Sequence, residues 1–465
     1  GDSRAFVRFI AQQWPSFFVH FIPQFLSKGW INVESKQAGL ILDVYDKPST
    51  GKGLLLSIQH IFAMFGATIL VPLVVGLPVS VALFASGVGT LVYQFLTQQK
   101  VPVYLGSSFA YISAMQIAIQ QMDGDLSASQ TGIILTGLAY VLIAGLIAVF
   151  GTDWLNRIMP PVVIGPMIMV IGLGLSATAI ENSGLVTGGS WREILVALVT
   201  FLVTAFVNTR AKGFMKIIPF LVGVVVGYLV AVLLGLVDFS PVAEADWFAL
   251  PEFYFPFETQ AFNSYDLYLG PETWAILPLV LATAAEHIGD HAMLGEICKK
   301  DFIDDPGLTR TLMGDGLATT LSAFFGGPAN TTYGENVGVI GMTRIASVSV
   351  VRNAAILAVI ISFLGKFTAL ISTIPDPVLG GMSIILYGVI ASSGLKVMIE
   401  DRTDFNKPRN LIIASAMLVI GIGGAVLDIG LVTLSGTVLS ALVGIVLNLI
   451  LPKDQDFQGD YLKDK

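Results

Sequence analysis

The chain has 465 residues, of which 54% are hydrophobic and only 12% are charged. Soluble globular chains carry about 25% charged residues, so this composition leaves too little polar surface for a water-soluble fold. The formal net charge of −8 argues against a nucleic-acid partner, which requires a basic face. Cys298 is the single cysteine, so no internal disulfide forms. We therefore expect an integral membrane protein whose solvent is the lipid bilayer.

Residues 1–53 precede the apolar spans and are predicted to lie on the cytoplasmic side or along the membrane interface. The first 35 residues mix aromatic side chains with Arg, Gln, His and Lys, which is the composition of an amphipathic interfacial segment. Pro15 and Pro23 interrupt any single long helix there.

A membrane span needs about 20 mostly apolar residues. Twelve such stretches begin, in chain order, near Leu54, Val79, Thr131, Pro160, Trp191, Lys216, Thr273, Leu308, Ile345, Pro377, Asn410 and Gly430. Two further apolar stretches, residues 104–119 and 331–342, are too short or too rich in glycine to cross as regular helices. Counting both predicts an all-α polytopic membrane protein with fourteen segments, in which segments 3 and 10 contain short extended stretches.

The charges of the connecting loops support this count. Inner loops are expected to be rich in Lys and Arg. With a cytoplasmic N-terminus, the inner connections carry Lys100, Arg157, Arg210, Lys212, Lys299, Lys300, Arg344, Arg402, Lys407 and Arg409. The predicted extracellular loop, residues 238–272, has acidic residues but neither Lys nor Arg. The pattern predicts a multi-pass protein with both termini cytoplasmic, ending in a tail over residues 453–465.

The two halves of the chain repeat the same plan. Each half has seven segments, and the third is the short one. His60 precedes Phe109 by the same number of residues by which Glu286 precedes Glu335. Because seven is odd, the two halves enter the membrane from opposite sides as inverted repeats. Matched, interrupted segments point to the binding site of a transporter, so we expect the site between residues 104–111 and 331–338.

Two carboxylates lie on one face of the eighth segment. Glu286 and Asp290 are four residues apart and share a helical face. Two acids that are close together in a low dielectric cannot both be ionised cheaply, so the pair is suited to carry a proton. The alternative is that they only form hydrogen bonds at a helix contact, which is a costly use of intramembrane acids.

The tenth segment carries a second candidate site. Gly and Pro residues form an extended stretch that opens into a short helix near Glu335. Free N–H groups at a helix start can donate to a ligand carbonyl, and Glu335 can accept N–H groups, unless it only caps its own helix. Residues 104–111 add an aromatic face. Together these groups suit a flat, neutral, hydrogen-bonding heterocycle, and the residues alone indicate a small polar cyclic solute.

Other readings remain open. His287 and His291 are spaced like two zinc ligands, but a catalytic zinc needs three protein ligands, so we predict no metal, no cofactor and no enzymatic activity. An anion exchanger on the same inverted fold is disfavoured by the acids in both half-sites. A channel is disfavoured because a charged, pocketed midplane suits alternating binding and release. Asp315 and Lys366 are expected to tie helices together.

The residues from Glu335 to Arg344 match the signature of the nucleobase–ascorbate transporter family, with Asn336, Gly338, and Thr343 followed by Arg344. The similarity runs from about Ser57 to Leu451. It includes Gln59-His60, Gly106-Ser107-Ser108-Phe109 and Asp305-Pro306-Gly307-Leu308. In this family, Glu at the first signature position goes with pyrimidines, Gln with purines and Pro with ascorbate. The chain resembles the bacterial members that transport uracil.

This resemblance implies an elevator-type transporter of the bacterial cytoplasmic (inner) membrane, built from two domains. The core domain would comprise residues 54–150 and 273–373. The gate domain would comprise residues 151–237 and 374–452, and would form a homodimer contact.

The resemblance also implies the ligand contacts. Uracil would be bound by Phe109, Glu286, Tyr333, Gly334 and Glu335, with His60 and Asn336 in support. Symport with H⁺ would use Glu286 and Asp290, with Na⁺ as an alternative ion. Uracil-type members carry His at the position of Asp290, whereas purine-type members often carry Asp. A purine such as xanthine or uric acid is therefore the alternative substrate.

Overall fold

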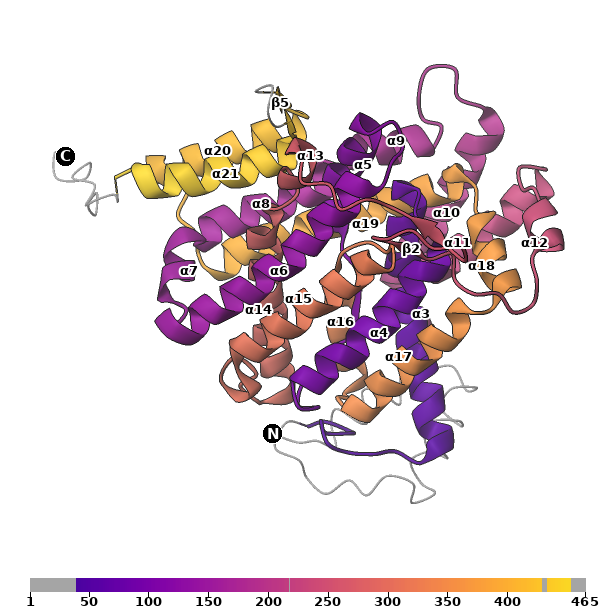
Figure 1. The fold of residues 1–465 in the computed structure, drawn as a ribbon, viewed down its shortest axis with the longest axis horizontal. Coiled ribbons are helices and arrows are strands. Elements are labelled where there is room, and N and C mark those ends of the chain that lie inside the picture. The colour runs from indigo at the N-terminus through magenta and orange to yellow at the C-terminus, as the bar shows by residue number, and fades with distance from the viewer. Residues whose placement is uncertain (1–38, 217, 429–432, 453–465) are drawn as a thin grey trace.

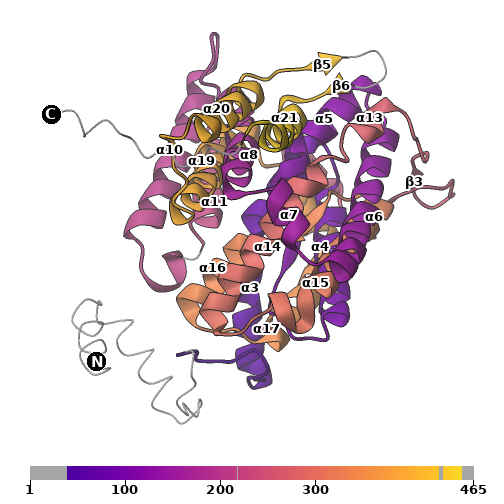
Figure 2. The same ribbon diagram turned by 90° about the vertical axis from the view of Figure 1, so that its left-hand side faces the viewer.

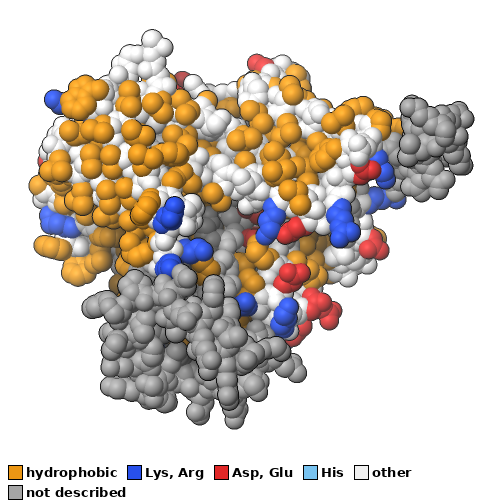
Figure 3. Space-filling view, turned by 180° about the vertical axis from the view of Figure 1, so that it is seen from behind, with side chains coloured by type: hydrophobic (Ala, Val, Ile, Leu, Met, Phe, Trp, Pro, Cys, Tyr) orange, Lys and Arg blue, Asp and Glu red, His pale blue; other side chains and the backbone are white. Residues whose placement is uncertain are grey.

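A computed structural model describes residues 39–216, 218–428 and 433–452. The interfacial segment predicted within residues 1–35 and the tail 453–465 lie outside this description. The chain folds into a mostly helical structure (Figure 1). Hydrophobic side chains cover broad areas of the face seen from behind, and most of the Lys and Arg side chains visible there lie toward the lower edge (Figure 3). This is the surface of a protein embedded in lipid.

Six helical stretches among the described residues are long and apolar enough to cross a membrane. They are α3 (Thr50–Val75), α4 (Val79–Leu96), α6 (Ser127–Phe150), α8 (Pro161–Leu173) together with α9 (Ser176–Asn182), α10 (Trp191–Arg210) and α19 (Asp376–Glu400). A bent pair, α17 (Val348–Ser362) and α18 (Gly365–Ser372), turns by 84° at its break. Shorter apolar helices are α11 (Pro219–Leu233), α20 (Pro408–Ile422) and α21 (Gly436–Ile450). The helices α14 (Leu279–Cys298) and α15 (Leu308–Phe324) carry more polar residues.

Two strands interrupt the helices where extended stretches were predicted. β1 (Leu105–Ser107) leads into the short 3₁₀ helix η1 (Phe109–Tyr111) and α5 (Ile112–Gln121), and β4 (Asn330–Thr332) leads into α16 (Gly334–Thr343). The strands pair antiparallel, with Gly106 opposite Thr331. Two segments that are more than 200 residues apart in the sequence are therefore joined by backbone hydrogen bonds.

Non-helical backbone inside a membrane is tolerated only where its polar groups are satisfied by protein. Side chains of neighbouring helices form hydrogen bonds with backbone groups that the two-stranded ladder leaves unpaired. The Leu105 N–H donates to Thr90 Oγ1 of α4 at 2.9 Å. Thr319 Oγ1 of α15 donates to the Asn330 carbonyl at 2.8 Å. A threonine on the preceding helix thus supports each strand.

The helices form two groups, which lie on opposite sides of the molecule (Figure 2). In the first helix group, α15 packs against α4 and α6, and α17 packs against α3 and α4. In the second helix group, α19 packs against α8 and α10, while α20 packs against α21 and α8. Helix α14 contacts α16 of the first group as well as α8 and α21 of the second. It therefore lies where the two groups meet.

The predicted extracellular loop is folded against the first helix group. It contains α12 (Ser240–Glu244), β2 (Tyr254–Phe255), β3 (Asn263–Ser264) and α13 (Pro271–Trp274). The Tyr254 N–H donates to the Phe325 carbonyl at 3.1 Å, and the Tyr265 hydroxyl donates to the Ala323 carbonyl at 2.8 Å. Lys366 Nζ of α18 donates to the Val242 carbonyl at 2.8 Å.

Several boundaries differ from the predicted ones. The first span begins at Thr50 rather than Leu54. The span expected from Thr273 is divided, because α13 ends at Trp274 and α14 begins only after Pro278, a residue that is tolerated at a helix start but not in its interior. The described end of the N-terminal segment, from Gly39, is bonded to the rest of the protein rather than separate from it.

Candidate functional site

Helix α14 presents Asp290 to the second broken segment. The Asp290 side chain is buried, and Thr332 of β4 donates its hydroxyl proton to Asp290 Oδ2 at 2.9 Å. A side chain added at Gly334 would place its first carbon 3.5 Å from Asp290 Oδ1. Glu286, one turn earlier on α14, is half-buried. Asp290 of the predicted acidic pair therefore meets the junction of β4 and α16.

The start of α16 offers backbone donors at this junction. Gly334 and Glu335 are its first two residues. The next two N–H groups, of Asn336 and Val337, both donate to the Tyr333 carbonyl. Helix geometry leaves the N–H groups at the start of a helix without intrahelical acceptors. The N–H groups of Gly334 and Glu335, the first two residues of α16, are therefore left without an intrahelical acceptor.

Two glycines leave room beside the acidic face. A side chain added at Gly289 of α14 or at Gly338 of α16 would meet no described atom within 4 Å. Gly289 directly precedes Asp290, and Gly338 lies one turn after the start of α16. An alanine would fit at either position without a clash.

Tyr333 joins the two broken segments. Its hydroxyl donates to the Ser107 carbonyl at 3.1 Å and lies 3.1 Å from Thr68 Oγ1. Its N–H donates to the Tyr104 carbonyl at 3.1 Å. A side chain at Gly106 would overlap the Tyr333 ring. Tyr333 was predicted to lie beside the substrate, and the structure places it at the contact between β1 and α3 on one side and β4 on the other.

The first broken segment contributes Phe109, which begins η1 and is half-buried. The two residues predicted to support the site, His60 and Asn336, lie together. Asn336 Nδ2 is 3.2 Å from His60 Nδ1 and 3.4 Å from the His60 carbonyl. Because the amide nitrogen donates, His60 Nδ1 accepts. This contact connects α3 to the first turn of α16.

The adjoining face of α14, about 100° round the helix, carries two histidines in a buried polar chain. His287 Nδ1 lies 2.9 Å from Asp315 Oδ2, and both side chains are fully buried. His291 Nδ1 donates to the His287 carbonyl at 2.7 Å, and its Nε2 contacts the Tyr93 hydroxyl. As predicted, Asp315 ties two helices together. No group of three metal-binding side chains gathers among the described residues.

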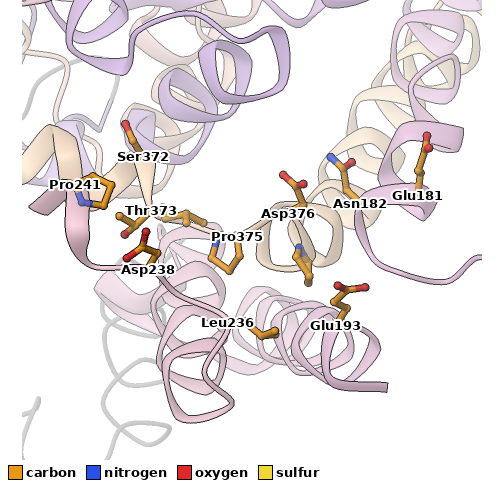
Figure 4. Close-up of a pocket in the computed structure, with 12 residues that line it drawn as sticks. Glu181, Asn182, Glu193, Leu236, Asp238, Pro241, Ser372, Thr373, Pro375 and Asp376 are labelled. Carbon is orange, nitrogen blue, oxygen red and sulfur yellow. The ribbon is translucent and has the colours of Figure 1, made fainter. Parts of the chain in front are cut away.

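A separate cavity of about 650 Å³ lies where α9, α10 and α19 meet the links to α11 and α18 (Figure 4). Its lining includes the carboxylates Glu181, Glu193, Asp238 and Asp376. The pKa of Asp238 lies below its usual range because the backbone N–H and the hydroxyl of Ser240 both donate to it. None of the residues predicted to bind substrate lines this cavity.

A profile of a permease family (Xan_ur_permease) matches residues 51–430. The chain belongs to this permease family. The match confirms the family resemblance seen in the signature, and it identifies an integral membrane protein of the transporter type. The uracil permease of Bacillus caldolyticus is 49% identical over 422 residues, which cover 89% of this chain and 95% of the relative. The uracil permease of Bacillus subtilis (strain 168) is 46% identical over 428 residues, covering 90% and 97%.

Solved structures with low sequence identity share the fold. The transmembrane domain of the cyanobacterial bicarbonate transporter BicA superposes with a TM-score of 0.58 at 16% identity, covering 85% of this chain and 96% of that one. The murine anion transporter SLC26A9 in its inward-facing state gives a TM-score of 0.65 at 12% identity, covering 87% and 69%. At this level of identity the likeness concerns the fold alone.

Sequence reasoning missed several residues at the site. Thr332, which donates to Asp290, lies inside the stretch that was predicted to form the site, but no sequence pattern singled it out as a partner of Asp290. The threonines that support the strands, Thr90 and Thr319, lie on ordinary apolar spans. A hydroxyl that faces a broken segment can be recognised only once the strand pairing is known.

Proposed function

We propose that this protein is a secondary active transporter that imports uracil by cation symport. The observation that carries the proposal is the meeting of Asp290, Gly334 and the start of α16 in a chain that is 49% identical to a uracil permease over 95% of that relative. Glu335, at the first signature position, supports a pyrimidine as the substrate.

The proposed binding mode pairs donors with acceptors. Uracil presents two N–H groups and two carbonyl oxygens on a flat ring. Glu286 and Glu335 would accept the ring N–H groups, and the N–H groups at the start of α16 would donate to a carbonyl. Phe109 would pack against the ring at its C5 edge. Hydrogen bonds to charged groups contribute about 1.5–3 kcal/mol each, so the two carboxylates would dominate the affinity.

We propose H⁺ as the coupling ion, carried by the Glu286–Asp290 face. A proton on Asp290 would remove one of the two negative charges of this face and leave Glu286 to accept the ring N–H, which would lower the cost of moving the loaded site past the hydrophobic barrier. Loss of that proton at the higher inner pH would favour release. Thr332 can donate to Asp290 in either protonation state of the carboxyl. Na⁺ is the alternative ion.

We also propose that the fourteen segments form inverted seven-segment repeats. The first helix group would be the moving core domain and the second the gate domain, through which two copies would dimerise. The protein would lie in the cytoplasmic membrane with both termini inside. Its outer loop would travel with the core, because its hydrogen bonds reach Phe325, Ala323 and Lys366 of the first group.

Uptake of radiolabelled uracil into proteoliposomes tests the substrate. We expect saturable uptake that unlabelled uracil inhibits strongly. Thymine should compete more weakly and cytosine hardly at all, because cytosine would leave buried partners unpaired. If xanthine competes better than uracil, Asp290 marks a purine transporter. If bicarbonate exchange occurs without nucleobase transport, the protein is an anion exchanger.

The variant Asp290→Asn tests the coupling. Asn keeps an oxygen that accepts the Thr332 hydrogen bond but cannot take up a proton. We expect uracil binding to persist in part, the pH dependence of uptake to flatten, and accumulation against a gradient to be lost. In the wild type, a protonophore should abolish accumulation and replacing sodium by choline should not. The reverse pattern would identify Na⁺ as the coupling ion.

A further inference from the structure

The chain before the first span runs as an extended strap along the inner end of α16. We define the inner strap as residues 40–46. The N–H groups of Ile41 and Leu42 donate to the Arg344 carbonyl at 2.7 and 3.3 Å, and the Ala346 N–H donates back to the Leu42 carbonyl at 2.8 Å. Leu42 and Ile345 form a parallel β-bridge. The strap thus pairs with the residues that directly follow the family signature.

The pairing continues to the start of α17. The Val348 N–H donates to the Val44 carbonyl at 3.0 Å, and the Ser347 hydroxyl donates to the Asp46 carbonyl at 2.6 Å. The whole link between α16 and α17 is therefore bonded on one side to the inner strap.

Buried apolar side chains hold the strap against the rest of the protein. Val44 is fully buried and Leu40 is 5% exposed. Both belong to one hydrophobic cluster with Val337 and Ile340 of α16. The cluster also contains Leu105 of β1, so apolar packing connects the strap to both broken segments.

The strap also reaches the end of α14. Lys300 Nζ lies 3.8 Å from Asp43 Oδ1 and 4.9 Å from the centre of the Tyr45 ring. The two helices that meet at the candidate site, α14 and α16, therefore share a contact at their inner ends.

Helix α16 needs such support because of its length. Ten residues of α-helix span about 15 Å, which is about half of a hydrocarbon core that is about 30 Å thick. The start of α16 is held by the Tyr333–Tyr104 and Asn336–His60 contacts. Its other end stops at Arg344, whose φ of 58° is left-handed. Without the strap, the residues after Arg344 would lose their hydrogen bonds to the backbone of residues 42–46.

We propose that the inner strap is a positioning element for α16, and that Val44 is its key positioning residue. By fixing the inner end of α16, the strap holds Gly334 and Glu335 in place at the other end. The expected change in uracil affinity rests on the proposed function, whereas the expected change in the mobility of α16 does not.

Hydrogen–deuterium exchange of the full-length protein without substrate tests the structural part. Val44→Ala should speed exchange of the amides of Val339–Ala346 by about tenfold, as expected for a lost buried contact of about 1.4 kcal/mol. Ile41→Ala is the matched control, because the Ile41 side chain is 38% exposed. It should leave exchange unchanged. Equal exchange in Val44→Ala and in the control would overturn the proposal.

Uracil binding by calorimetry tests the positioning role. Val44→Ala should weaken binding about tenfold while lowering the midpoint of thermal unfolding only slightly, and Val44→Ile, which keeps a β-branched apolar side chain there, should bind uracil as the wild type does. Ser347→Ala, which keeps the packing but removes the bond to Asp46, should show a smaller loss. Normal affinity in Val44→Ala, with fast α16 exchange, would refute positioning.

The two proposals fail in different ways. If the wild type binds no uracil but Val44→Ala still frees α16, the substrate is wrong and the strap remains. If the wild type binds uracil and neither exchange nor affinity responds to Val44→Ala, the strap proposal fails alone.

Discussion

The two broken segments have the same backbone plan and different contents. In the first, β1 leads into η1, and the break carries Ser108 and Phe109. In the second, β4 leads into α16, and the break carries Tyr333, Gly334 and Glu335. The first break carries an aromatic residue, and its strand is bonded to Thr90 of α4. The second break begins a helix and lies beside Asp290. In the proposed binding mode, the first segment would shape the site and the second would supply its hydrogen bonds.

The comparison predicts its largest effect at Glu335. Glu335→Gln keeps the shape of the side chain but replaces one acceptor oxygen by a donor. Binding of uracil should weaken by about 2–4 kcal/mol, roughly 30- to 1,000-fold, as measured by calorimetry. Glu181→Gln is the control. Glu181 lines the separate cavity between α9, α10 and α19, so this variant should bind uracil normally. Near-normal affinity in Glu335→Gln would remove this residue from the site.

Substitutions at Gly106 and Gly334 distinguish an effect on folding stability from an effect on uracil binding. Gly106→Ala would force a side chain into the Tyr333 ring, so it should lower stability by about 1–3 kcal/mol, seen as a lower midpoint of thermal unfolding. Gly334→Ala makes only an ordinary contact with Asp290 at 3.5 Å. It should keep that midpoint and weaken uracil binding instead. If both variants lose stability equally, the proposed division between the segments is wrong.

Substitutions of Thr90 and Thr319 compare how much each threonine contributes to the stability of its strand. Thr90 exchanges hydrogen bonds with both backbone groups of Leu105, whereas Thr319 donates only to Asn330. Polar contacts within membranes are worth about 0.6 kcal/mol on average and up to about 1.7. Thr90→Val should therefore destabilise the protein more than Thr319→Val does, when both are compared by thermal unfolding in one detergent. The opposite order would mean that β4 is the weaker strand.

The smallest effect on uracil affinity is expected at Phe109. Replacing its ring by Leu removes aromatic packing worth about 0.5–1.5 kcal/mol, which corresponds to a loss of roughly two- to twelvefold in uracil affinity. Thymine should lose less, because the smaller side chain relieves crowding at its methyl group. Competition binding measures both ratios. An unchanged preference for uracil over thymine would show that Phe109 does not face the C5 edge.

Much of the fold could be predicted because lipid imposes strong rules. Apolar length predicted a helical membrane protein, and six described stretches are long and apolar enough to cross a membrane; the count of fourteen segments stays a prediction. The interrupted stretches at 104–119 and 331–342 contain β1 and β4. The spacing of Glu286 and Asp290 placed both on α14, where Asp290 contacts β4. These features depend on local sequence alone.

Other features depend on contacts between distant residues and were not predicted. Thr332 donates to Asp290 only because the strand before α16 passes α14. His60 and Asn336 were both expected to support the site, but their mutual contact requires α3 to cross α16. The inner strap was not predicted, because the apolar run around Leu40 and Val44 is too short to span a membrane, and its pairing with residues 344–348 joins parts of the chain that are about 300 residues apart.

The β1–β4 ladder has a consequence for how such carriers diverge. Its bonds join main-chain atoms, so most substitutions along it leave the crossing of the two segments intact. If the breaks bind the substrate as proposed, mutations there would change the solute that is recognised while the pairing of the two strands persists. A frame of this kind is tolerant of drift in side chains and intolerant of insertions, since one extra residue in a three-residue strand would reverse every side chain after it. This agrees with a fold shared with a bicarbonate transporter at only 16% identity.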